Sequence, residues 1–443
     1  MRSVEKPPRM PQGGVALLKA MEELQAAGKF EELRQIEESS YPYWEKWKYL
    51  AKEWSCDPKK VWGAVKGQRY SQKTINFSGL EMHLNTPSFL QEQLHDLDMN
   101  LGGSLHTSDL IPTAEKQRYL VSSLMEEAIA SSQLEGAATT RKLAKEMLES
   151  NRKPRNLSEQ MIANNYTAMQ WIVDHKDVTM TPDLILQIHQ IITSGTLPDG
   201  REEGAFRTSD DVRIIDVQTG TILHTPPPSA LLEKLMTEFC IFANDQRKEN
   251  FFLHPISKAI IVHFLTGYIH PFADGNGRTA RALFYWYLIK KGYWLIEYMS
   301  VSRVILGSKS QYARAYQYTE LDENDLTYFV AYNLKCIGTA LEELKKYISR
   351  KNKEKKTMLQ LLRNTDYNER QQFMLQQILN EEKTTFTVSE IESKFDVSNQ
   401  TARNDLNFLV EKGILDPKRL GRQIHFLVTI DAAKKIQSAS TAR

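Results

Sequence analysis

The sequence predicts a mainly α-helical protein with a small β-hairpin in its core and two further strands near the C-terminus. Apolar residues recur at helical spacing over long stretches, as between Lys258 and Ile269. Glycines such as Gly136 and Gly292 stand where those helices would end. Short alternations of apolar and polar residues, as at 212–214, are typical of strands.

The composition is that of a globular chain with two to three domains. The chain has 443 residues, of which 41% are hydrophobic and 25% charged. Its formal net charge of +2 predicts no general affinity for nucleic acids or membranes. The three cysteines, Cys56, Cys240 and Cys336, have no metal-binding or redox spacing. The longest apolar run is too short to cross a bilayer and the N-terminus lacks a signal core, so we expect a cytoplasmic protein without a membrane partner.

Breaks in these patterns divide the chain into four regions. They are an N-terminal helical region (1–69), a core (70–348), a basic linker (349–366) and a C-terminal domain (367–443). The first region contains aromatic residues interleaved with lysines: Tyr41, Tyr43, Trp44, Trp47 and Tyr49. Such residues can stack on nucleic-acid bases. They more often pack a small helical module, which is the interpretation we favour.

A helix of about four turns is expected over 121–136, because the segment is rich in good helix formers and closes on Gly136. Ser131 and Glu135 are four residues apart and therefore lie on one face of this helix. Taken alone, Glu135 would be interpreted as a solvated carboxylate on a surface helix.

A hairpin is expected next in the core. The alternation of Val212 and Ile214 with Arg213 predicts a short strand that continues through Ile215, and a turn near Gly220 leads into a partner strand. A purely structural hairpin, buried by helices, is the simplest interpretation of these residues.

The most informative segment runs from His270 to Arg281, with the sequence HPFADGNGRTAR. Pro271 disfavours a helical conformation for His270, so the histidine should lie where a helix gives way to a loop. Gly275 and Gly277 would let backbone N–H groups approach an anion closely. A helix starting after them would add N–H groups that carry a partial positive charge.

The polar residues of this segment suit phosphate transfer. Arg278 and Arg281 are three residues apart, so they project from roughly the same face of a helix and can clamp two phosphates. Asp274 offers the oxygen ligand that Mg²⁺ requires. His270 can take a proton from an incoming hydroxyl near neutral pH. Each part alone is commonly structural, and it is their joint occurrence in this order that indicates a functional site.

The segment resembles, at every defining position, the HxFx(D/E)GNGRxxR signature of the Fic family, whose members transfer AMP from ATP to a protein hydroxyl. The resemblance implies that His270 is the general base and Asp274 the Mg²⁺ ligand. It implies that the turn cradles the α- and β-phosphates, with Arg278 at the β-phosphate and Arg281 at the γ-phosphate. The residues assigned in this way to ATP binding are Asp274, Gly275, Asn276, Gly277, Arg278, Thr279, Ala280 and Arg281.

The upstream helix resembles the (S/T)xxxE(G/N) inhibitory motif of the same family, in the N-terminal position called class II. Ser131, Glu135 and Gly136 occupy its defining positions. The resemblance implies that Glu135 pairs with Arg281, so that ATP binds in a pose that does not expose its α-phosphorus. The same glutamate could instead orient a water molecule for AMP removal.

Two further parts of the nucleotide and target sites follow from the resemblance. The GxFR…V segment is similar to the Fic flap, a hairpin that would hold a target peptide by strand addition. The flap candidates, which we also count among the ATP-site residues, are Val212, Arg213, Ile214 and Ile215. Tyr312 and Tyr316 share a helix face where the family places adenine contacts, and Tyr312 is assigned to the ATP site.

The C-terminal region resembles a winged helix-turn-helix. Helices are expected at 371–379, 388–395 and 399–412, the last capped by Ser398, followed by two strands joined by a basic turn. The residues that would face DNA are Thr401, Arg403 and Asn404 in the major groove, and Arg419 and Arg422 at the backbone. Acidic neighbours offset the basic ones, so protein docking or dimerisation is an equal alternative.

Two classes of function remain. The first is a protein adenylyltransferase that uses ATP and Mg²⁺ to modify a Ser, Thr or Tyr hydroxyl of a target protein and is inhibited by Glu135. The family resemblance adds self-modification and a homodimer as expectations. The second is a nucleotide-sensing, DNA-binding regulator. Transfer of another nucleotide, or removal of AMP, are variants of the first class. The intact His270 favours an enzyme, because a sensor would have no use for a base.

Overall fold

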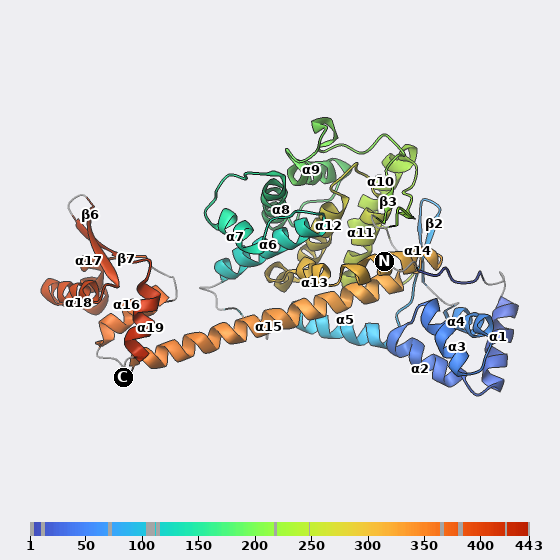
Figure 1. Ribbon diagram of the computed structural model, residues 1–443, viewed down its shortest axis with the longest axis horizontal. Coiled ribbons are helices and arrows are strands. Elements are labelled where there is room, and N and C mark those ends of the chain that lie inside the picture. The colour runs from blue at the N-terminus through green and yellow to red at the C-terminus, as the bar shows by residue number, and fades with distance from the viewer. Residues whose placement is uncertain are drawn as a thin grey trace. The chain divides into compact units, whose positions relative to one another are not determined.

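The computed structural model describes residues 4–9, 14–69, 73–102, 111, 116–216, 219–247, 249–363, 367–379, 384–420 and 423–441. It confirms the mainly helical fold (Figure 1). Contacts divide the chain into two compact units, Met1–Leu344 and Lys345–Arg443, and each is described by itself. Of the helices in the described part of the chain, none combines the length and apolar character needed to cross a bilayer.

The first unit begins with a small helical module, which consists of α1 (Gly14–Ala26), α2 (Phe30–Ser40), α3 (Trp44–Glu53) and α4 (Pro58–Gln68). Its core contains Tyr41, Tyr43, Trp44 and Trp47, whereas Tyr49 is exposed. The interpretation that these aromatics pack a helical module is therefore confirmed for four of the five.

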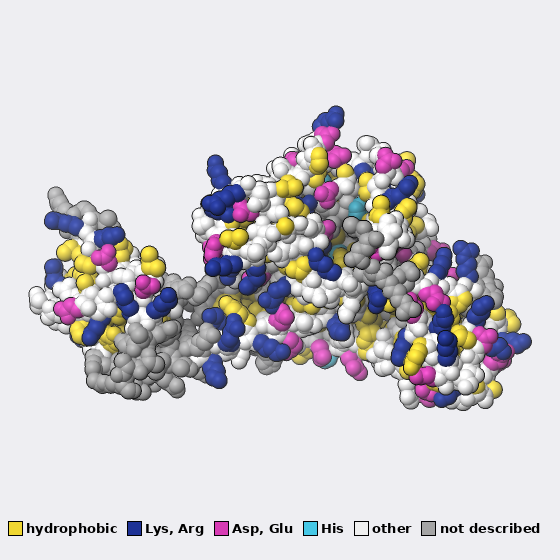
Figure 2. All heavy atoms as spheres, viewed as in Figure 1, with side chains coloured by type: hydrophobic (Ala, Val, Ile, Leu, Met, Phe, Trp, Pro, Cys, Tyr) yellow, Lys and Arg dark blue, Asp and Glu magenta, His cyan; other side chains and the backbone are white. Residues whose placement is uncertain are grey.

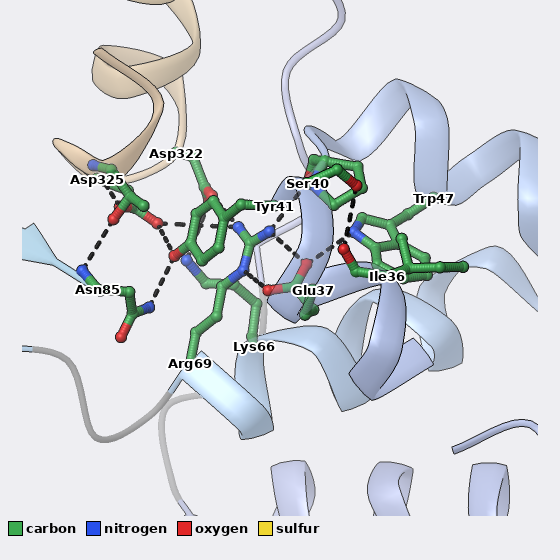
Figure 3. A network of polar contacts seen from close by, with 12 residues as sticks. Ile36, Glu37, Ser40, Tyr41, Trp47, Lys66, Arg69, Asn85, Asp322 and Asp325 are labelled. Atoms are coloured by element: carbon green, nitrogen blue, oxygen red, sulfur yellow. Dashed lines mark hydrogen bonds and ion pairs between the residues drawn. The ribbon is translucent and has the colours of Figure 1, made fainter. Parts of the chain in front are cut away.

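A buried polar network ties this module to the turn between α14 (Lys309–Leu321) and α15 (Thr327–Arg363) (Figure 3). The guanidinium of Arg69 donates two hydrogen bonds to the carboxylate of Glu37, at 2.7 and 2.8 Å, and lies 3.4 Å from Asp322. Tyr41 donates to Asp325 at 2.6 Å. Buried charges are tolerated only when they are paired and hydrogen-bonded, so these contacts fix the module against the α14–α15 turn.

A hairpin that the sequence analysis did not anticipate follows the module. Strands β1 (Lys73–Phe77) and β2 (Leu80–Leu84) pair in antiparallel fashion. The core therefore contains this hairpin in addition to the expected one. The alternation was present in the sequence, since Ile75, Phe77 and Met82 are buried and their neighbours face outward.

The remaining helices of the first unit enclose a central pair, α11 (Pro255–Ile269) and α12 (Asn276–Lys290). They are α5 (Ser88–Leu101), α6 (Lys116–Leu134), α7 (Arg141–Glu149), α8 (Leu157–Asp174), α9 (Pro182–Thr193), α10 (Leu232–Ala243) and α13 (Val301–Gly307), with short 3₁₀ turns η3 (Gly200–Glu202), η4 (Ser229–Leu231) and η5 (Trp294–Tyr298). Helix α12 packs against α6, α8, α9 and α11 (Figure 1). Both central helices are buried on nearly all sides, as is typical of helices in the interior of a domain.

The second hairpin of the core consists of β3 (Ile214–Ile215) and β4 (Ile222–His224), in which Ile214 pairs with His224. The predicted strand was to begin at Val212, but the ladder begins two residues later. Its register shifts between Ile214 and Ile215, so the paired stretch is shorter than the apolar alternation suggests.

The second unit has the expected helix-turn-helix with a wing. Its elements are α16 (Glu369–Leu379), β5 (Thr385–Thr387), α17 (Val388–Phe395), α18 (Asn399–Glu411), β6 (Leu415–Leu420), β7 (Gln423–Val428) and α19 (Ala432–Thr441). The sheet has the order β5-β7-β6 and is antiparallel. Ser398 caps α18 by accepting a hydrogen bond from the N–H of Thr401 at 3.2 Å, as predicted. Strand β5 and helix α19 were not predicted, and Arg422 lies outside the described residues.

Candidate functional site

The segment His270–Arg281 forms the connection between α11 and α12. His270, at φ 48° and ψ 59°, is left-handed and ends α11. Gly275, at φ 83°, is also left-handed and precedes the first turn of α12. The side chain of Asn276 closes the loop, because its amide accepts a hydrogen bond from the N–H of Phe272 at 3.0 Å and donates one to its carbonyl at 2.8 Å. Asn276 therefore offers an incoming anion its backbone N–H rather than its side chain.

His189 on α9 packs against this loop and supports it, although no motif in the sequence pointed to this residue. Its ring stacks on Phe272 with a centroid separation of 3.7 Å. Nδ1 accepts a hydrogen bond from the N–H of Gly204 at 3.1 Å, so the proton is on Nε2, which donates to the carbonyl of Asp274 at 2.8 Å. Burial lowers the pKa of His189 to about 4, which keeps the ring neutral near pH 7.

His270 has the tautomer and charge of a base. Its Nδ1 lies 3.1 Å from the carbonyl oxygen of Gly267, which can only accept, so Nδ1 carries the proton and Nε2 keeps a lone pair. Burial lowers the pKa of His270 below its usual 6.5, so the neutral ring predominates near pH 7. Arg207, a buried residue of the GxFR segment, donates from Nε to the carbonyl of His270 at 2.9 Å. Arg207 belongs to the GxFR segment, but the sequence pattern alone gives it no such role.

Arg281 is 3% exposed and lies against the end of α6. Its Nε donates to the hydroxyl of Ser131 at 2.8 Å, and its Nη2 donates to the carbonyl of Ser131 at 2.9 Å and to Glu135 Oε1 at 2.8 Å. Gly136, at φ 95°, is left-handed and lies two residues after the end of α6 at Leu134. The structure thus brings Ser131, Glu135 and Arg281 into one hydrogen-bonded cluster.

The carboxylate of Glu135 lies directly over the backbone at the start of α12. A Cβ atom added at Gly277 would lie 2.0 Å from Glu135 Oε1. The N-terminus of a helix attracts anions through its free N–H groups and its dipole. Glu135 therefore occupies the position at Gly277 where an external anion would approach α12.

The other residues of the segment divide between the site and the interior. Arg278 is buried and donates from Nη1 to the carbonyl of Ile192 at 3.2 Å, while its Nε has no partner among the described residues. The Asp274 carboxylate is 63% exposed and accepts a hydrogen bond from the N–H of Gly275 at 2.5 Å. Thr279 and Ala280 are buried and pack inward.

The flap candidates connect to the end of α11 through the paired strand. Ile215 is exposed, Arg213 is exposed, and Val212 and Ile214 are half-buried. On β4, His224 lies with Nε2 2.7 Å from the carbonyl of Tyr268 and Nδ1 2.7 Å from Glu320 on α14. Sequence reasoning did not identify His224.

Two of the three tyrosines of α14, Tyr312 and Tyr316, lie beside α11. The hydroxyl of Tyr312 lies 2.8 Å from Nε2 of His263. The rings of Tyr312 and Tyr316 meet edge to face, with their centroids 5.3 Å apart. Burial raises the pKa of both hydroxyls, which therefore stay protonated.

Two segments of the sequence match models of known protein families. Residues 179–288 match the Fic/DOC family, a segment that runs from the approach to α9 through most of α12. Residues 370–421 match the DeoR-like helix-turn-helix domain. One segment of the first unit thus matches the Fic/DOC family, and one segment of the second unit matches the DeoR-like helix-turn-helix domain.

Parts of this chain are also similar in sequence to curated proteins. The protein adenylyltransferase Fic of Aedes aegypti is 31% identical over 172 residues, which are 39% of this chain and 30% of that protein. The protein of the same name from Nematostella vectensis is 38% identical over 120 residues, which are 27% of this chain and 25% of that protein. This chain thus spans less than a third of the length of these curated relatives.

The likeness extends to a solved structure. A crystal structure of a Fic family protein from Desulfovibrio desulfuricans G20 has a TM-score of 0.50 and 20% identity, and the match covers 78% of this chain and 97% of that one. At this level of identity the likeness supports the fold.

The loop predicts a difference between two glycine substitutions. Gly275→Ala should destabilise the first unit more than Gly292→Ala, by roughly 1–3 kcal/mol, because it adds a collision to the strain of a left-handed residue. Both glycines have positive φ, but a Cβ at Gly275 would lie 2.8 Å from Thr193 Cγ2 and 3.0 Å from His189 Nε2, whereas nothing lies within 4 Å at Gly292. Chemical unfolding of the two variants measures the difference, and equal losses would contradict the close packing of the loop.

Proposed function

We propose that this chain is a protein adenylyltransferase that transfers AMP from ATP to a Ser, Thr or Tyr hydroxyl of a target protein, and that Glu135 inhibits it. The observation that carries the proposal is the hydrogen bond of 2.8 Å between Glu135 and Arg281 at the N-terminus of α12. It joins the two motifs that resemble the Fic family, and it fills an anion position at the start of α12. The names of the relatives support the same activity.

In the proposed reaction, the residues of the loop hold the nucleotide and move one proton. The N–H groups at the start of α12 and the guanidinium groups of Arg278 and Arg281 would bind the phosphates. The target hydroxyl would attack the α-phosphorus while its proton passes to Nε2 of His270, and the bond to pyrophosphate would break. The lone pair on Nε2 and the lowered pKa of His270 support this role.

The residues present fit a magnesium ion that is shared with the substrate. Mg²⁺ is commonly held by one or two carboxylates and by substrate phosphates. Asp274 supplies one exposed carboxylate at the loop, with Oδ1 engaged by the N–H of Gly275. When bound, the ion would neutralise phosphate charge.

The proposed inhibition follows from two contacts of Glu135, one with Arg281 and one with the backbone at Gly277. Its carboxylate pairs with Arg281, and it lies over Gly277 where a phosphate would approach. A nucleotide would have to displace it or bind elsewhere. Breaking this largely buried, charge-assisted pair, in which Arg281 is 3% and Glu135 31% exposed, costs on the order of a few kcal/mol, which corresponds to rate changes of roughly 10² or more.

Substitution of Glu135 tests the proposal. Glu135→Gly should raise the transfer of AMP by roughly 10² or more over the unchanged chain, because Arg281 and the α12 N-terminus become free. His270→Ala should abolish transfer, alone and combined with Glu135→Gly. Label from α-³²P ATP on added lysate proteins, or on the chain itself, gives the readout. Equal label in all variants would refute the proposed function.

The pH profile tests the role of His270. Because its folded pKa is lowered from 6.5, the neutral base persists to lower pH, and activity should be lost only as pH falls through that lowered value. For Glu135→Gly, the acid limb of kcat/KM for ATP should therefore have its midpoint below pH 6.5. ATP binding measured over the same range serves as the control. A midpoint above 6.5 would contradict a buried histidine base.

A second candidate function is DNA binding by the second unit, which the DeoR-like match favours. On α18, Arg403 and Asn404 are exposed, whereas Thr401 is half-buried. Figure 2 shows acidic side chains interspersed with the basic ones on the visible face, so any binding should depend on a few contacts. We expect Arg403→Ala to weaken a gel shift on duplex DNA and to reduce its salt dependence, whereas Lys434→Ala on α19 should leave it unchanged. No shift at low salt would exclude this function.

A further inference from the structure

Helix α6 carries a fully buried carboxylate, Glu127, that neither motif includes. Glu127 is 1% exposed. It accepts hydrogen bonds from the Tyr285 hydroxyl at 2.9 Å, from the Ser300 hydroxyl at 3.0 Å and from the N–H of Ser302 at 3.0 Å, and a further one from the Ser302 hydroxyl. A buried carboxylate is expensive unless such donors surround it. Its position is therefore narrowly determined.

The donors come from two elements that are themselves fixed. Tyr285 lies on α12, and its hydroxyl also accepts a hydrogen bond from the N–H of Val301 at 2.9 Å. Ser300 caps α13, and Ser302 lies in its first turn. Glu127 thus joins α6 to α12 and to the start of α13 at one point.

The spacing relates this point to the inhibitory contact. Glu127, Ser131 and Glu135 follow one another at four-residue intervals: Glu127 and Ser131 share a face of α6, and Glu135 lies directly after the helix ends at Leu134. Arg281 and Tyr285 are also four residues apart, on the facing side of α12. The two helices are thus linked by two rungs: Arg281 with Ser131 and Glu135, and Tyr285 with Glu127.

We propose that Glu127 is a positioning residue that sets the place of α6 along α12 and so holds Glu135 on Arg281. The proposal rests on the proposed function, in which that contact is inhibitory. A helix rises about 1.5 Å per residue. If α6 slid along α12 by about one residue, the hydrogen bond of 2.8 Å between Arg281 and Glu135 would be lost. The Arg281 rung combines buried hydrogen bonds to Ser131 with a carboxylate, Glu135, that is 31% exposed. The Glu127 rung is buried throughout and therefore adds a second fixed point to the register of α6 along α12.

Substitutions of Glu127 should change inhibition without changing the active loop. Glu127→Ala removes the rung and should raise AMP transfer about tenfold over the unchanged chain. Glu127→Gln should remain inhibited, because its carbonyl oxygen can replace Oε2 while its NH₂ donates to the Ser302 hydroxyl. Glu126→Ala is the matched control: it removes the neighbouring carboxylate of α6, which bonds Arg141 at the surface, and should also remain inhibited.

Combination with Glu135→Gly separates positioning from general damage. If Glu127 acts through Glu135, then Glu127→Ala should change transfer by a factor near one once Glu135 is gone. A purely structural role would instead lower transfer in both backgrounds. Tyr285→Phe provides a second way to weaken the rung if Glu127→Ala fails to fold, since it keeps the carboxylate and the ring, and it should show the same dependence on Glu135.

Hydrogen exchange gives a readout that needs no activity. Amides in the last turns of α6 should exchange faster in Glu127→Ala than in Glu126→Ala or the unchanged chain. Absence of label in Glu135→Gly would refute the proposed function while exchange still reports on the rung. Continued inhibition of both Glu127→Ala and Tyr285→Phe, or unchanged exchange at the end of α6, would overturn the positioning role.

Discussion

The burial of Arg281 is the constraint on which the site depends. A guanidinium in the interior of a helical domain needs acceptors for its N–H groups, and α12 supplies none of those seen here. All three come from Ser131 near the end of α6 and from Glu135 directly after it, so this end of α6 must lie against α12 to satisfy the arginine. Because one acceptor is the carboxylate of Glu135, the same contact that satisfies the arginine also brings a negative charge to the start of α12. Stability and the proposed inhibition are thus consequences of one interaction.

The loop between α11 and α12 is likewise held by a small number of contacts. His270 and Gly275 both adopt left-handed conformations, which turn the chain sharply at each end of the loop. Asn276 and His189 then use side chains to close and support the backbone between them. Side-chain groups hold the shape of the loop, and the carboxylate of Glu135 lies over the backbone at the start of α12.

Local patterns in the sequence were sufficient where structure depends on neighbours along the chain. The end of α11 at His270 follows from Pro271, and the start of α18 follows from the cap at Ser398. The pairing of strands β1 and β2 also had a local signature, the alternation about Ile75 and Met82, which went unused. Element β5 is only three residues long, too short for periodicity to reveal.

Contacts between distant segments were not accessible in that way. Glu135 and Arg281 are 146 residues apart, and only the family resemblance suggested that they meet. Glu127 looks in sequence like any other glutamate of a helix, because its burial depends on Tyr285 and Ser302, which arrive from later elements. His189 and Arg207 were missed for the same reason: each derives its importance from backbone groups that the fold brings to it.

Because Gly277 has no side chain, the carboxylate of Glu135 can lie against the start of α12. It is there comparable to a ligand that is tethered to its own binding site. Such a ligand is always present at an effective concentration that the protein sets, in the millimolar range for short flexible links and higher for a rigid helix. In the proposed function, a nucleotide would compete with a fixed concentration of carboxylate, independent of how much protein is present. Anything that loosens α6 would then act as a dilution of that internal ligand, with no change in the affinity of the α12 N-terminus for phosphate.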